Sequence, residues 1–235
     1  MKQGIVRSIR LFKSFLVEQT QPEVFYGELA RDSANLIEQY GSLIGKTLVD
    51  VGAGPHQFAR EFAGRGAVYV PVDLDSEAPS LSYGGAAADA QSLPFADNSM
   101  DVTFSSNLIE HVPNPSAVAN ELVRVTKPDG LVFIAYTNWF SPWGGHETSP
   151  WHWFGGRYAI RRYTRKHGFL PKNRVHENLF PVSVSWGIDW AHAHPSFDVV
   201  ECRPRYLPKW AKFLVFVPGL REVVTWNLLL ILRKR

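Results

Sequence analysis

Residues 48–75 read LVDVGAGPHQFAREFAGRGAVYVPVDLD, and this stretch predicts the fold. Leu48–Val51 is a short β-branched run, typical of a strand buried in a parallel sheet. A glycine turn follows, then helical spacing over Gln57–Arg65, then a second strand over Val68–Val72 that ends at Asp73. The order strand, turn, helix, strand predicts an α/β protein with a Rossmann-like doubly wound sheet.

The turn and the end of the second strand predict a nucleoside site. Gly52, Ala53 and Gly54 let a ligand approach the backbone, because no large side chain stands in the way. Asp73 can accept hydrogen bonds from ribose hydroxyls. Together these positions favour a ligand that contains ribose.

Three neighbouring residues argue against a phosphate-bearing ligand. Gln57 stands where the dinucleotide pattern has its third glycine. Pro55 removes an N–H donor that a pyrophosphate would use, and Asp50 would repel phosphate but hold an amino group. A nucleoside that carries an amino acid fits better, so the sequence predicts S-adenosylmethionine (SAM) as the cofactor.

Four motifs in order resemble the class I SAM-dependent methyltransferases. They are DVGAG at 50–54, ADAQSLPFADNSMDV at 88–102, NLIEHV at 107–112 and RVTKPDG at 124–130. The resemblance implies a mostly parallel sheet with an antiparallel last strand, helices on both faces, and a long lid insertion after strand five. His56 and Asp129 depart from the family pattern, but neither has to carry the cofactor.

The resemblance also implies which residues contact SAM. Asp89 would accept the adenine amino group while the Ala90 N–H donates to a ring nitrogen. Tyr26 and Arg31 would close over the methionine end, with Arg31 clamping the carboxylate. The other predicted contacts lie at strand ends, because ligands of open α/β sheets bind there: Leu74, Gln91, Ser106 and Asn107.

Length and composition predict one domain over residues 1–235. The resemblance implies that it is a methyltransferase domain, with a helical cap at 1–44 and a substrate lid at 137–170. The net charge of +3 gives no reason to expect a nucleic-acid partner. The single Cys202 indicates a reducing, cytoplasmic setting. No apolar run reaches the ~18–20 residues that span a bilayer. The sequence does not predict an oligomeric state.

Two segments leave peripheral membrane contact open. Residues Lys2–Val17 form a basic amphipathic helix with one apolar stripe, made of Ile5, Ile9, Phe12 and Leu16. This helix is either a membrane-surface anchor or a cover for the domain, and the periodicity alone favours the cover. Lys209–Pro218, KWAKFLVFVP, is the more plausible lipid-contacting segment.

The family pattern breaks at Thr137–Gly156, TNWFSPWGGHETSPWHWFGG. Its prolines and glycines exclude a regular helix or strand, and long loops in compact domains are usually functional. Because it follows strand five, we interpret it as the substrate lid. Its aromatic side chains either fill the core or form a wall for sugar rings or lipid chains. The segment resembles uncharacterised methyltransferases of mycobacteria, organisms that methylate many sugar hydroxyls, and this implies a small-molecule or glycan acceptor.

Transfer to a hydroxyl needs a proton acceptor or a metal. The candidate catalytic residues are His111, His146 and Glu147. The Glu110-His111 pair resembles that of ubiquinone-pathway and small-RNA 2′-O-methyltransferases, which implies a divalent metal, Mg²⁺ or another, on Glu110, His111 and His146. In those families an acidic residue three positions before the Glu also binds the metal, and this chain has Asn107 there. The open alternative is that no metal binds and a histidine acts as the base.

The sequence thus predicts a SAM-dependent methyltransferase that methylates a hydroxyl of a sugar, glycolipid or polysaccharide. One alternative is a C-methyltransferase of a lipid or quinone at the membrane surface. Another is a non-catalytic SAM-binding scaffold module.

Overall fold

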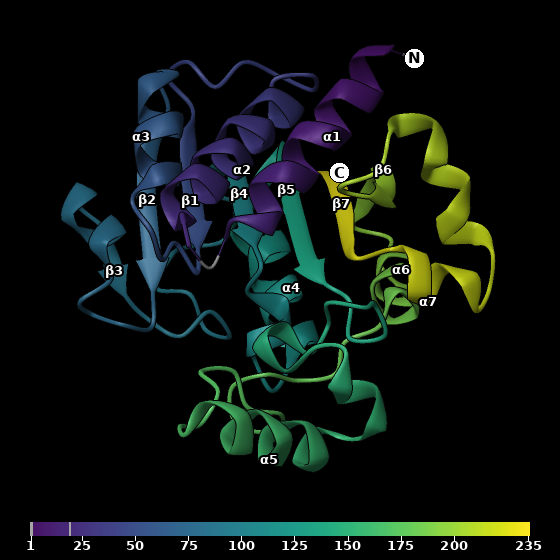
Figure 1. The fold of residues 1–235 in the computed structure, drawn as a ribbon. Helices are drawn as coiled ribbons and strands as arrows, with labels where there is room; N and C mark the ends of the chain where they lie inside the picture. The colour runs from purple at the N-terminus through teal and green to yellow at the C-terminus, as the bar shows by residue number, and fades with distance from the viewer. Residues whose placement is uncertain (1, 19) are drawn as a thin grey trace.

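The computed structural model describes residues 2–18 and 20–235. At its centre is a seven-stranded sheet in the order β3-β2-β1-β4-β5-β7-β6 (Figure 1). β7 is antiparallel to both neighbours, and the other neighbouring pairs are parallel. The strands are β1 (Thr47–Val51), β2 (Val68–Asp73), β3 (Ala86–Ala87), β4 (Met100–Ser106), β5 (Thr126–Thr137), β6 (Phe197–Pro204) and β7 (Asn227–Lys234). The predicted Rossmann-like sheet with an antiparallel last strand is confirmed.

Helices cover both faces of this sheet. One buried cluster joins α1, α2 and α3 to the sheet and includes Leu29 and Phe62. A second cluster, on the other face, joins α4 and α6 and includes Leu122 and Ile188. The helices are α1 (Lys2–Leu16), α2 (Pro22–Ile37), α3 (Gln57–Gly64), α4 (Pro115–Val125), α5 (Gly156–His167), α6 (Val184–Ala193) and α7 (Leu220–Val224). Short 3₁₀ helices are η1 (Pro79–Tyr83), η2 (Ile109–His111), η3 (His146–Thr148), η4 (Trp151–Phe154) and η5 (Lys209–Phe216).

β7 shows why an unbroken apolar run is compatible with a strand. Leu228, Leu230 and Leu232 belong to one cluster, and Leu229 and Ile231 belong to the other. A strand with helices on both of its faces buries every side chain. The sequence NLLLIL is therefore an interior strand.

Two helices after β4 are capped by side chains. In α4 the Asn114 side chain is the cap, accepting from the Ala117 N–H at 3.2 Å, and Ser116 lies inside the helix. The Ser116 hydroxyl lies 3.2 Å from Trp186 Nε1 instead. α6 was not predicted, since its tryptophans and histidines obscure the helical period; Ser183 caps it through the Trp186 N–H.

α1 packs on the domain, but through residues other than the predicted stripe. Leu11 is fully buried, and Phe15 contacts the Phe25 ring at 6.0 Å. The stripe residues Ile5, Ile9 and Leu16 are exposed instead. α1 therefore meets α2 through a side of the helix other than the apolar stripe.

The segment after β5 is irregular, as its prolines and glycines predict. It runs through η3 and η4 into α5, below the carboxyl edge of the sheet in Figure 1. Among the helices of the described ranges, none has both the length and the apolar content to cross a membrane.

Candidate active site

The glycine turn closes onto the end of β2. The N–H groups of Gly52 and Ala53 donate to the Val72 carbonyl at 2.8 and 3.0 Å. Gly52 has φ +77°, and a Cβ there would lie 2.9 Å from Leu108 Cδ1. Any other residue at this position would have a strained backbone, and its Cβ would clash with Leu108 in the loop after β4. Both reasons favour glycine at position 52.

The Asp73 carboxylate is fixed at the tip of β2. Its Oδ2 accepts from the Gly54 N–H at 2.8 Å, and its Oδ1 accepts from the Asp75 N–H at 3.0 Å. The next residue, Leu74, is largely exposed. The turn and the acidic strand end are thus one hydrogen-bonded unit, and ribose binding by Asp73 stays a prediction.

The predicted adenine-binding residues lie in the loop after β3. Asp89 is exposed, and its Oδ1 accepts from the Gln91 N–H at 2.9 Å, while Ala90 is buried. The Arg124 guanidinium holds this loop by donating to the carbonyls of Leu93 and Phe95 at 3.1 and 2.9 Å. The loop is therefore anchored on α4, with a carboxylate open to solvent.

Asp50 lies inside the protein beneath the turn. It is 2% exposed, and its Oδ2 accepts from the Tyr69 hydroxyl at 2.6 Å. Burial raises the pKa of the Asp50 carboxyl to about 7. The structure thus shows an internal hydrogen bond, and the predicted contact of Asp50 with an amino group of the ligand stays a prediction.

The two residues predicted to close over the methionine end differ in their surroundings. Arg31 is half-exposed and pairs with Glu28 at 2.5 Å, which also pairs with Arg10 at 2.7 Å. Tyr26 is partly buried, and burial together with the nearby Glu18 raises its pKa to about 12. Tyr26 is therefore directed toward the interior, whereas the Arg31 guanidinium is already paired at the surface.

A buried arginine that sequence reasoning missed lies at the same edge. Arg205 follows β6, is 0% exposed, and donates to the Ser106 and Ser33 hydroxyls at 2.8 and 2.6 Å. Its Nε has no partner among residues 2–18 and 20–235. Asn107 at the end of β4 accepts from the Asn227 amide at 2.8 Å. The signal that could have found Arg205 is its place directly after β6, whose end lies at the same edge of the sheet as the end of β4.

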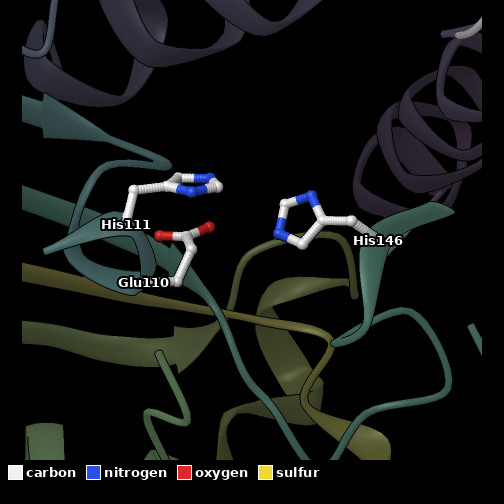
Figure 2. Close-up of side chains that lie close together, drawn as sticks. All are labelled: Glu110, His111 and His146. Atoms are coloured by element: carbon white, nitrogen blue, oxygen red, sulfur yellow. The ribbon is translucent and has the colours of Figure 1, made fainter. Parts of the chain in front are cut away.

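The lid brings His146 to the pair that follows β4. One ligand atom from each of Glu110, His111 and His146 lies within 4.8 Å of the others. Figure 2 shows Glu110 and His111 on one segment and His146 facing them from another. Glu110 is 1% exposed; its Oε1 accepts from the Thr137 N–H at 2.8 Å, and its Oε2 has no partner in the described chain. We call these three residues the Glu-His-His cluster.

The two histidines of the cluster are held in different ways. His111 Nδ1 lies 2.7 Å from the Asn178 carbonyl, which can only accept, so Nδ1 carries the proton and Nε2 keeps a free lone pair. His146 has φ +49°, and its Nε2 is buried without a partner in the part of the chain described. Burial and the nearby His111 lower the pKa of His146 to about 3, and burial raises the pKa of Glu110.

The third predicted catalytic residue, Glu147, does not join the cluster as its neighbour His146 does. Both oxygens of its carboxylate accept from the Asn173 amide, at 3.1 and 3.0 Å. Glu18 lies nearby, in the turn between α1 and α2. Burial raises the pKa of the Glu18 carboxyl, and the negative charge of Glu147 raises it further. Sequence reasoning missed Asn178 and Glu18, since loop residues far along the chain carry no motif.

The lid aromatics divide into two groups. Trp143 packs inside against Phe15 and Trp226, with ring centroids 5.2 and 5.9 Å apart. Trp153 and Phe154 are exposed, and the Arg162 guanidinium lies 3.8 Å from the centre of the Trp151 ring. Core packing is therefore confirmed for Trp143, and a substrate wall made of the exposed side chains stays a prediction.

Comparison with known proteins agrees with this geometry. Residues 49–134 match the family model described as a methyltransferase domain. An "uncharacterized methyltransferase" of Mycobacteroides abscessus is 44% identical over 97% of this chain and 94% of that protein. Another, of Mycobacterium sp. (strain KMS), is 44% identical over 97% of this chain and 95% of that protein. A SAM-dependent methyltransferase of Mesorhizobium loti has the same fold, with a TM-score of 0.56, 16% identity, and coverage of 86% of this chain and 98% of that chain.

The fold and the glycine turn with its acidic partner define a Rossmann-like SAM-dependent methyltransferase. At the identity and coverage given above, the chain belongs to the family of these mycobacterial methyltransferases. It is therefore a methyl-transferring enzyme whose cofactor is SAM.

Proposed function

We propose that the protein transfers the methyl group of SAM to a hydroxyl of a sugar, glycolipid or polysaccharide. The observation that carries this proposal is the Glu-His-His cluster. It presents two buried atoms that have no partner among the described residues, Glu110 Oε2 and His146 Nε2, beside a histidine whose tautomer is fixed. Buried polar atoms without partners are rare in folded proteins, and those found at a strand's carboxyl edge point to a ligand or a reacting group.

SAM would lie across the turn and the strand tips. The positive φ of Gly52 and the Asp73 carboxylate fit the ribose, and Asp89 with Ala90 fits the adenine. When bound, SAM supplies an activated methyl group on a positively charged sulfur. The protein therefore has to position the acceptor and receive its proton.

His111 is the residue best placed to receive that proton. The Asn178 carbonyl fixes its Nδ1–H, so its Nε2 is the basic nitrogen. Glu110 lies against it, and an ionised Glu110 would stabilise the protonated ring, as the carboxylate does in a catalytic triad. His146 is neutral at pH 7, because its pKa is lowered to about 3, and so serves as a hydrogen-bond acceptor for the substrate hydroxyl.

The same three residues also suit a divalent cation. Two imidazoles and a carboxylate are ligands for Zn²⁺ and related ions, and a carbonyl on the far nitrogen of His111 is the usual partner of a metal-bound histidine. A bound ion would lower the pKa of a hydroxyl oxygen that it contacts. A rise in melting temperature with Zn²⁺, Mn²⁺ or Mg²⁺ that Glu110→Gln abolishes would support the metal, and full transfer activity in excess chelator would exclude it.

The exposed lid aromatics support a sugar acceptor. Trp153 and Phe154 present flat apolar faces to solvent beside the cluster-bearing loop, and sugar rings stack on such faces through their C–H groups. The alternative acceptor, a carbon centre of a lipid or quinone, would use the same base. It is favoured by the exposed apolar residues of α1 and η5.

Incubation with radiolabelled SAM and fractionated extract tests the proposal. The label should be recovered as a methyl ether of a sugar-containing product, whereas a C–C-bonded methyl would favour the lipid or quinone. His111→Gln should reduce transfer by about 100- to 10,000-fold and leave the affinity for S-adenosylhomocysteine within about threefold.

The matched control is His167→Gln, at the exposed end of α5. It should transfer at the rate of the parent. Full transfer by His111→Gln would contradict the proposed base. Tight cofactor binding with no turnover in any fraction would instead favour the scaffold module.

A further inference from the structure

We propose that α1 and the segment from η5 through α7 form one surface that docks on an anionic lipid bilayer. We call these residues the docking face. The proposal goes beyond methyl transfer and uses none of the residues assigned above to the cofactor or the acceptor. Its evidence is the direction in which two apolar stripes point, their adjacency, and the charges that flank them.

The stripe on α1 faces solvent. Its residues are exposed by 44%, 50%, 37% and 59% in the order Ile5, Ile9, Phe12 and Leu16. Their spacing of four, three and four puts them on one side of a helix. A helix that already packs Leu11 and Phe15 against the domain therefore carries a second apolar side, which is largely open to solvent.

η5 carries a second outward stripe. Trp210, Phe213 and Phe216 are exposed by 57%, 53% and 61%, whereas Ala211 and Val215 are buried. A 3₁₀ helix has three residues per turn, so side chains three apart lie in line. The three aromatic rings therefore project together, and Leu220 and Val223 of α7 extend the exposed set.

The two stripes belong to one continuous surface. A Cβ on Gly4 would lie 3.7 Å from Pro208, the residue before η5, and Arg7 Nη1 donates to the Arg205 carbonyl at 3.0 Å. At the other end of α1, the Phe12 ring lies 5.7 Å from that of Trp226, which follows α7. α1 and η5 lie toward the same side of the molecule in Figure 1.

The charge of the docking face matches an anionic bilayer. Neither α1 nor η5 contains an acidic residue. Lys13 and Lys212 are exposed, and neither is in an ion pair within the described residues. The only carboxylate of α7, Glu222, accepts from the Val184 and Ser185 N–H groups and so points inward. Apolar side chains flanked by cations are the pattern of interfacial helices, and each cation adds attraction to anionic lipid.

Two further features favour a bilayer over a second copy of the chain. A two-fold dimer would place the same cationic face on both sides of its interface, which is repulsive. In addition, a cavity of about 310 Å³ opens under η5, where Lys209, Lys212 and Glu201 line it together with apolar residues. Glu201 pairs with Lys209 at 3.7 Å, so Lys212 is the cation that this recess offers to an anionic lipid headgroup.

Vesicle co-sedimentation of the full chain tests the proposal. The protein should bind vesicles in which about one-third of the phosphatidylcholine is replaced by phosphatidylglycerol, and bind pure phosphatidylcholine more weakly. The double variant Phe213→Ser/Phe216→Ser should bind the anionic vesicles at least about tenfold more weakly. Lys13→Glu/Lys212→Glu should lose the preference for anionic lipid.

The matched control is Phe169→Ser/Leu170→Ser, which replaces two equally exposed apolar residues after α5, at the far end of the molecule in Figure 1. The proposal fails if the control loses as much binding as the η5 variant, or if the parent does not sediment with anionic vesicles. It also fails if the η5 variant converts a dimer to a monomer in the absence of lipid. Unchanged affinity for S-adenosylhomocysteine shows that each variant is folded and leaves the proposed function standing in every case.

Discussion

The proposed cofactor end and the proposed acceptor end of this enzyme are built in different ways. At the cofactor end, Gly52, Gly54 and Asp73 belong to one strand-turn-helix-strand unit and are joined by backbone hydrogen bonds. At the acceptor end, His111 follows β4, His146 lies on the lid, and the carbonyl that orients His111 comes from Asn178. The first end is local in sequence, and the second exists only once three distant segments have packed.

This difference predicts separable effects of mutation. Changes at the turn should alter cofactor affinity, because the ligand contacts depend on that backbone. Changes in the Glu-His-His cluster should alter transfer and titration while cofactor affinity is kept. The four predictions below test this separation in order of expected size.

The largest effect is expected for Asp73→Ala. It removes the acceptor for ribose and leaves the Gly54 N–H without its 2.8 Å partner. Affinity for S-adenosylhomocysteine, measured by calorimetry, should fall by about 100-fold or more. Asp75→Ala, an exposed acid in the same loop, should change it by less than about threefold, and equal losses in both variants would contradict a specific role for Asp73.

A smaller loss is expected for Gly52→Ala. The new Cβ must adopt φ +77° and would lie 2.9 Å from Leu108, a strain of about 1–3 kcal/mol. Cofactor affinity should fall by about 10- to 100-fold. Gly64→Ala in α3, where a Cβ meets nothing within 4 Å, is the control and should bind as the parent does.

His146→Gln should change the pH dependence of stability while leaving cofactor affinity intact. The folded-state pKa of His146, about 3, lies below its unfolded value, so the unfolded chain binds more protons between these two values. Stability of the parent therefore falls as the pH drops from about 6.5 toward 3, by up to about 1.4 kcal/mol per pH unit for this group.

Denaturant titrations at several pH values measure that slope. In His146→Gln the stability should fall less steeply as the pH drops, because glutamine does not titrate. An unchanged slope would show that the His146 ring is solvated, and a large loss of S-adenosylhomocysteine binding would contradict the separation of the two ends.

The smallest effect concerns α4, which supports both ends. Asn114→Ala removes the cap of this helix and should lower the free energy of unfolding by about 1 kcal/mol. Asn114→Ser keeps an acceptor oxygen and should lower the free energy of unfolding by only a few tenths of a kcal/mol. Denaturant midpoints measure both, and a Ser variant as weak as the Ala variant would show that the cap does not hold α4.

The sequence determined the sheet and the cofactor end by itself. The β-branched run before Gly52, the turn, and the acid at the end of the next strand follow one another within 48–75, so short-range steric and hydrogen-bonding rules decide their structure. The interior strand NLLLIL was also predictable, because a strand with five apolar residues in a row has to be buried on both faces.

The tertiary structure decided which surfaces of those elements meet. Periodicity showed that α1 has an apolar stripe but could not show that α2 would pack on its other side. The same is true of Arg205, Asn178 and the capping Asn114, whose partners are set by segments that approach only in the folded chain. Side-chain patterns specify what an element can bury, whereas the packing of many elements together selects what it does bury, and here that choice created both the Glu-His-His cluster and the exposed docking face.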